Sequence, residues 1–105
     1  MRTLKTEELK AKMENDEAVV IEVLKEEDYN KSHIKGAINI PLRIIGHEAE
    51  KRFDKDEPIV VYCSDKDCSA SPAAAKKLED LGFTLIYHFK GGKKAWKEAE
   101  LPMES

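Results

Sequence analysis

The chain has 105 residues, a net charge of −3, and a composition that is 41% hydrophobic and 37% charged. This length and balance predict one globular domain, residues 1–105, with a single modest core and a dense charged surface. The slight negative charge gives no reason to expect nucleic acid or an anionic membrane as a partner. The N-terminus lacks the apolar segment of a signal peptide, and no apolar run approaches the ~18 residues of a membrane span.

The only two cysteines, Cys63 and Cys68, are too few for the disulfide framework of a small secreted domain. Their closeness predicts thiol chemistry in a reducing compartment, so we expect a cytoplasmic protein. With no histidine nearby in the sequence, they fall short of the four ligands of a structural metal site. We therefore expect no metal and no cofactor, and a domain of this size is expected to be a monomer.

Strand and helix patterns alternate along the chain. The elements predicted in the first half are a helix over 7–13 capped by Thr6, a strand over 18–23, a short helix or turn over 26–29, a turn over 33–36 and a strand over 37–40. Those predicted in the second half are a helix from Pro41 toward Phe53, a strand over 59–62, a helix over 71–81 with Ser71 as N-cap and Pro72 at its first position, a strand over 83–87 and a helix over 93–98. This alternation predicts an α/β domain with a mainly parallel central sheet, flanked by helices on both faces.

Cys63 directly follows the apolar run 58–62 and precedes a polar stretch that ends where a helix is predicted to begin. Sites in open parallel sheets form beyond the carboxyl ends of the strands. A thiol placed there faces the free N–H groups and the positive end of a helix dipole, which stabilise a thiolate. We therefore expect Cys63 to be presented to solvent as a reactive thiolate, in a pocket ringed by main-chain donors.

Three pieces of the sequence, in this order and spacing, resemble a single-domain rhodanese, a family of sulfurtransferases. They are 20–23 with 33–41, 60–63 with 73–78, and 81–83 with 90–96. The resemblance covers about 4–102 and implies the rhodanese-like α/β fold. It also implies that Cys63 takes sulfane sulfur from a small-molecule or protein donor, holds it as a persulfide and passes it to a thiol or another nucleophile. The loop residues that would bind the substrate are Ser64, Asp65, Lys66, Asp67, Cys68 and Ser69.

The loop departs from the pattern of the family that it resembles. The family's loop is six residues long and often has an arginine at its sixth position, which is Cys68 here, and residues 69–70 lengthen it. Asp65, Lys66 and Asp67 sum to one negative charge, which argues against an anionic donor such as thiosulfate. Lys66 is the one loop residue that could steer an anion.

Cys68 leaves alternatives open. As a resolving thiol it would attack a Cys63 persulfide or sulfenic acid, releasing sulfide or forming a disulfide; otherwise it is a small loop residue. The pair would also suit a thiol redox sensor, and a non-catalytic rhodanese-like interaction module is a further alternative. Phosphatase or arsenate reductase chemistry is disfavoured, because the position where such loops need an arginine is Ser69.

Other conspicuous residues are interpreted as structural. Glu22 keeps an acid found at the end of the family's first strand, whereas Leu24 replaces an arginine. We expect His33 to hydrogen-bond backbone groups and Trp96 to cap the core. Two histidines and two glycines are expected at the surface, in packing or in a turn: His47, His88, Gly91 and Gly92.

Overall fold

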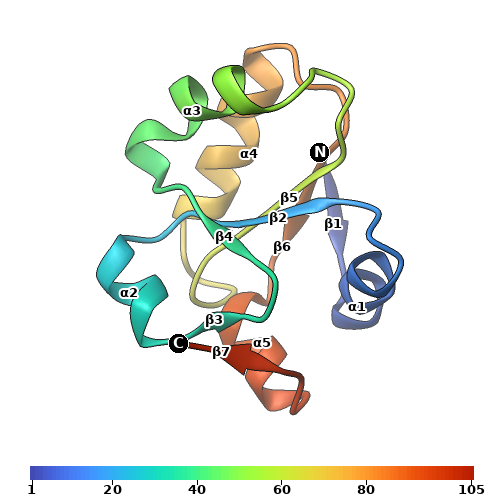
Figure 1. Cartoon of the computed structure of the whole chain (residues 1–105), viewed down its shortest axis with the longest axis vertical. Coiled ribbons are helices and arrows are strands. Elements are labelled where there is room, and N and C mark those ends of the chain that lie inside the picture. The colour runs from blue at the N-terminus through green and yellow to red at the C-terminus, as the bar shows by residue number, and fades with distance from the viewer.

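The computed structural model describes residues 1–105 and contains a five-stranded sheet (Figure 1). The strand order is β1-β6-β5-β2-β4, and every neighbouring pair is parallel. These strands are β1 (Arg2–Leu4), β2 (Val19–Glu22), β4 (Ile38–Asn39), β5 (Ile59–Tyr62) and β6 (Ile86–Phe89). A separate antiparallel pair joins β3 (His33–Ile34) to β7 (Met103–Glu104). The predicted α/β class with a mainly parallel sheet is confirmed.

Helices cover both faces of the sheet (Figure 1). On one face lie α3 (Ile45–Arg52), which follows a 3-10 turn at Leu42–Ile44, and α4 (Ala70–Asp80). On the other face lie α1 (Thr6–Glu14) and α5 (Gly92–Glu98), and α2 (Glu26–Lys31) follows β2. No helix combines the length and the apolar composition that crossing a membrane requires.

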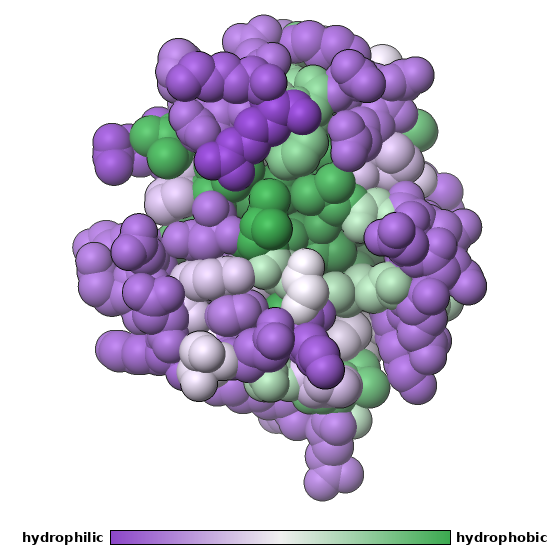
Figure 2. Space-filling view, viewed as in Figure 1, coloured by the Kyte–Doolittle hydropathy of each residue, from purple (hydrophilic) through white to green (hydrophobic).

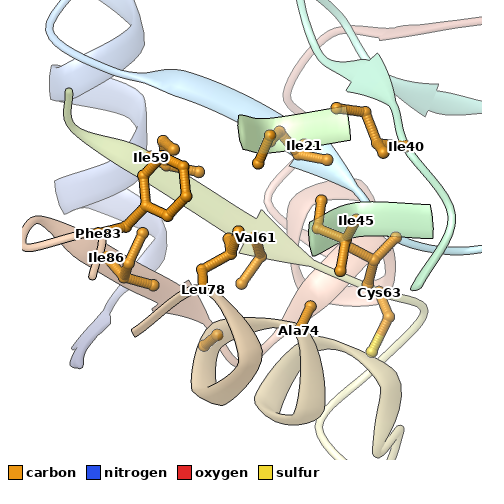
Figure 3. Packing of buried hydrophobic residues seen from close by; sticks show 13 residues of the cluster. Ile21, Ile40, Ile45, Ile59, Val61, Cys63, Ala74, Leu78, Phe83 and Ile86 are labelled. Carbon is orange, nitrogen blue, oxygen red and sulfur yellow. The ribbon is translucent and has the colours of Figure 1, made fainter. Parts of the chain in front are cut away.

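The core has two halves, one on each face of the sheet. Successive residues of β5, and Cys63 directly after it, contribute to the two halves in turn. Ile59, Val61 and Cys63 belong to the half beneath α3 and α4, whereas Val60 and Tyr62 belong to the half beneath α1 and α5. Successive side chains of a strand point to opposite faces, so a strand covered on both faces needs a continuous apolar run. Cys63 thus ends the α4 half of the core, and its side chain points toward the first turn of α4 (Figure 3).

The surface is largely hydrophilic, as the charged composition predicts. The face seen in Figure 2 is apolar at its centre and is surrounded by hydrophilic residues. Among the large apolar residues of the chain, Met1 and Leu85 are the exposed ones. The remaining large apolar side chains are buried or partly buried.

Two predicted helix starts are wrong by one or two residues. Ser71 is not the N-cap of α4, because the helix begins at Ala70 after Ser69 and buries Ser71 in its first turn. Pro72 fits that first turn, where the backbone N–H groups have no intrahelical partner. Thr6 is likewise the first residue of α1 rather than its cap.

Other boundaries differ because long-range pairing decides them. The predicted turn over 33–36 is a strand in its first half, since His33 and Ile34 pair with residues near the C-terminus. The strand predicted over 83–87 lies instead at Ile86–Phe89. The short strands β1 and β7 were not predicted, because three and two residues carry too little pattern to indicate a strand.

Candidate active site

Cys63 lies at the carboxyl edge of the sheet, directly after β5, but its side chain is buried. Only 1% of the residue is exposed, and it packs with the core beneath α4. The hydrogen-bond partner of its sulfur is a side chain, Ser71 Oγ, at 3.1 Å. The prediction of a solvent-presented thiolate ringed by main-chain donors is therefore wrong for this form of the protein.

The structure pairs Cys63 with Cys68 as a disulfide. Their Cα atoms are 6.4 Å apart, within the range that disulfides span. A tight turn folds the loop back: the Asp65 carboxylate accepts from the N–H of Asp67 at 2.9 Å, and the Asp65 carbonyl accepts from the N–H of Cys68 at 3.2 Å. Aspartate favours such turns because its short side chain can bond the backbone two residues on. Cys68, which is only partly buried, thus covers the sulfur of Cys63.

A chain of hydrogen bonds runs from the Cys63 sulfur into the protein. Ser71 Oγ lies 3.1 Å from Cys63 Sγ and 2.8 Å from His88 Nε2, and all three residues are buried. A disulfide sulfur carries no hydrogen, so the Ser71 hydroxyl must be the donor to it. Ser71 Oγ then accepts from the N–H of His88 Nε2. Both donors point toward Cys63, which is the orientation that would also stabilise a thiolate there.

His88 is therefore not a surface or simple packing residue, and the sequence interpretation of it is corrected. Burial lowers the pKa of His88 below its ordinary value of 6.5, and the nearby charge of Lys90 lowers it further. The ring is neutral at neutral pH. The sequence signal that was available is the position of His88 in β6. Side chains of a strand point to alternate faces, so His88 faces the same side as Ile86, and His88 is in register with Val61 of β5.

The start of α5 holds the first residues of the cysteine loop, the segment 63–69 between β5 and α4, in place. The N–H groups of Lys93 and Lys94 donate to the carbonyls of Cys63 and Ser64 at 3.0 and 2.9 Å. Gly92 makes this approach possible: a Cβ there would lie 2.9 Å from the Asp65 nitrogen and 2.9 Å from the Ser64 carbonyl carbon. Its φ of +64° is also a conformation that side-chain-bearing residues rarely adopt.

Gly92→Ala is expected to displace the loop. The left-handed conformation costs a non-glycine residue about 1–2 kcal/mol, and the clash with the loop backbone adds to it. Gly82→Ala is the matched control, because Gly82 also has a positive φ but nothing lies within 4 Å of its would-be Cβ. The variant at 92 should melt at a lower temperature than the control, and a dithiol reagent should reduce its disulfide faster. Equal melting and equal reduction would contradict this account.

A buried ion pair ties the same helix to the sheet. Lys93 Nζ lies 3.0 Å from Glu22 Oε2, and Glu22 Oε1 accepts from the Tyr62 hydroxyl at 2.8 Å. Lys93 also donates to the carbonyls of Asp28 and Ser32 at 2.9 and 2.7 Å. Burial raises the pKa of Glu22 above its ordinary value, although Lys93 and Tyr62 oppose the shift. The pair thus links α5, which holds the loop, to β2 and β5 of the sheet.

Two hollows open beside the cysteine loop. The first, of about 240 Å³, is lined by Asp65, Lys66 and Asp67 together with residues of α5. The second, of about 590 Å³, includes Ser64 and lies between the loop, α2 and α5. Its charged lining residues are Asp28, Lys31, Lys93, Lys94 and Lys97. Since Lys93 is paired with Glu22, three lysines and one aspartate remain, so the net charge of this lining is positive. The net charge of the loop residues alone does not show this.

The other residues singled out in the sequence lie around the loop or in the core. Ser69, exposed, precedes α4, and Cys68 lies against Cys63. His33 donates from Nδ1 to the Tyr29 carbonyl at 2.9 Å, which confirms its structural role. Trp96 is 4% exposed in the core, as predicted. No three histidine, cysteine, aspartate or glutamate side chains lie close enough together to hold a metal ion.

Fold and site together define a class of protein: a parallel α/β domain with a cysteine loop between a central strand and a helix. The family model described as the rhodanese-like domain matches residues 5–99, and the chain belongs to this family. The resemblance noted in the sequence is thus confirmed.

The chain is also similar to individual proteins over most of its length. The chain is 30% identical over 92 residues to the thiosulfate sulfurtransferase GlpE of Glaesserella parasuis serovar 5, covering 88% of this chain and 82% of that protein. It is 35% identical over 96 residues to the uncharacterized protein YqhL of Bacillus subtilis, covering 91% and 72%. The solved structure of the BH2092 protein from Bacillus halodurans is similar with a TM-score of 0.91 and 27% identity, over 99% of this chain and 77% of that one.

Proposed function

We propose that this protein is a sulfurtransferase that carries sulfane sulfur as a persulfide on Cys63 and passes it to a thiol or another nucleophile. The observation that carries the proposal is the hydrogen-bond chain from His88 through Ser71 to the Cys63 sulfur. A structural cysteine would not need two aligned buried donors, whereas a thiolate that attacks a donor sulfur is stabilised by them. The relatives named as thiosulfate sulfurtransferases support the same reaction class.

The donor that we propose is anionic. Asp65 and Asp67 argue against such a donor, but the lysines that line the hollow beside Ser64 supply a positive potential next to the loop. Thiosulfate, inorganic polysulfide and an anionic organic persulfide all share the required chemistry, which is a negatively charged group attached to a transferable sulfur. The acceptor is a thiol, of a small molecule or of a partner protein, or another nucleophile.

Sulfur transfer from a panel of these donors to an external thiol tests the proposal. Cys63→Ser should abolish transfer from every donor, because serine is not a comparable nucleophile and forms no persulfide. Cys68→Ser should retain formation of the sulfur adduct. Transfer that survives the loss of Cys63 would refute the proposal, and so would a wild-type protein that accepts sulfur from no donor.

The disulfide supports a second candidate, a redox sensor that uses Cys63 and Cys68. In a sensor, peroxide would oxidise Cys63 to a sulfenic acid, and Cys68 would condense with it. The two candidates separate by the rate at which the Cys63 thiol is consumed: in a sensor it reacts faster with peroxide than with a sulfane donor, and in a sulfurtransferase the order is the opposite.

A further inference from the structure

We propose that Cys68 is a resolving thiol that turns a Cys63 persulfide into free sulfide and the Cys63–Cys68 disulfide. The chain would then reduce sulfane sulfur, in addition to carrying it. This inference rests on the proposed persulfide at Cys63, but it assigns a further activity to a residue that a carrier does not need.

The backbone of the loop already places the two sulfurs together. The turn at Asp65–Asp67 brings Cys68 back over Cys63, and the Cα separation of 6.4 Å needs no rearrangement of β5 or α4 to close the bond. The ring closed is short, with a sequence separation of five, so little chain entropy opposes it. A thiol held this close has a high effective concentration at the Cys63 sulfur.

The reaction balances with two thiols and one sulfane sulfur. In the first step the Cys63 thiolate attacks the sulfane sulfur of the donor, forming the persulfide and releasing the rest of the donor with its electron pair. In the second the Cys68 thiolate attacks Cys63 Sγ, forming the bond between the cysteines and breaking the bond from Cys63 Sγ to the outer sulfur. That sulfur leaves with the electron pair as hydrosulfide, so it is reduced by two electrons while the two cysteines are oxidised.

The burial of the two cysteines sets the order in which the disulfide is reopened. Cys63 is 1% exposed, whereas Cys68 is partly exposed, so an external dithiol reductant reaches the sulfur of Cys68 first. Cys63 is then the leaving thiolate, and the hydroxyl of Ser71 already donates to its sulfur. A stabilised thiolate leaves faster. The second thiol of the reductant releases Cys68, and the protein returns to its dithiol form.

A single-turnover experiment tests the proposal. The fully reduced protein is mixed with inorganic polysulfide, desalted rapidly and held without any external thiol, while released sulfide, free thiols and intact mass are followed. Wild type should release about one sulfide per chain, lose both thiols and retain no added sulfur. Cys68→Ser should keep one added sulfur atom and release sulfide only when a thiol is supplied.

Other results of this experiment would contradict the resolving role of Cys68 or the proposed function. A wild-type protein that keeps its added sulfur as stably as Cys68→Ser overturns the resolving role but leaves the proposed function intact. Added sulfur found on Cys68 overturns it also, because attack on the outer sulfur relays that atom and forms no disulfide. If neither protein takes up sulfur, the proposed function itself fails. If the Cys63→Ser variant takes up sulfur on Cys68, both the resolving role and the proposed function are overturned.

Discussion

Lys93→Met is expected to lower the free energy of unfolding by about 3 kcal/mol, because it leaves the buried carboxylate of Glu22 without its cation. Methionine keeps the length of the side chain, so lost packing contributes little. The melting temperature should fall by at least ~10 °C for a domain of this size. Lys94→Met, an exposed neighbour on the same helix, is the matched control and should leave both quantities unchanged.

A double variant and the dependence on pH identify the cause of this loss. Glu22→Gln combined with Lys93→Met should regain most of the stability, since it removes the unpaired charge as well. Burial already raises the pKa of Glu22 from 4.5, and without Lys93 it rises further. A carboxyl group whose pKa is raised by folding stabilises the folded state, and this stabilisation is complete below pH 4.5. It is lost as the pH increases through the pKa that Glu22 has in the folded protein. Lys93→Met should therefore be least destabilised at acid pH, and a loss that does not change with pH would contradict the assignment.

Ser71→Ala is expected to slow sulfur transfer about tenfold at neutral pH. Hydrogen bonds to charged groups contribute about 1.5–3 kcal/mol, and the variant removes the one that reaches the Cys63 sulfur. The pH at which the transfer rate reaches half its maximum should shift upward by about one unit or more. The rate at high pH should recover, because the thiolate then forms without help.

A purely structural role of Ser71 predicts a different result. It would lower the melting temperature without moving the pH profile, so an unchanged profile would contradict the proposed role. Ser71→Thr, which retains the hydroxyl, is the conservative variant and should restore the profile in part. His88→Asn should also shift the profile upward, because it changes the donor that orients the hydroxyl of Ser71.

The sequence predicts most of the framework because the framework is local. A few neighbouring residues are enough to indicate each of three features: the apolar run 59–62, the helix after the loop, and the glycine pair at the start of α5. The pairing of β3 with β7 joins residues some seventy positions apart, and neither strand is long enough to carry a pattern. Sequence patterns therefore missed it.

The position of Cys63 in the fold was predicted, but its surroundings were not. Cys63 follows the strand as the pattern predicts, yet its side chain packs into the core beneath α4 and Cys68 lies against it, which the pattern does not indicate. The contact between Ser71 and His88 joins α4 to β6, so no spacing in the sequence reveals it. A histidine on the inward side of a buried strand was the one available signal, because that position otherwise takes an apolar residue.

Peptide mass mapping of the sulfur adduct shows which cysteine receives the sulfur. Reduced Cys68→Ser protein, in which a persulfide cannot be resolved, is loaded with thiosulfate or polysulfide, alkylated and digested. One additional sulfur atom is expected on the peptide that contains Cys63, and it should be lost when an acceptor thiol is added before alkylation. A Cys63 peptide that is alkylated at the unmodified thiol under every donor would contradict it.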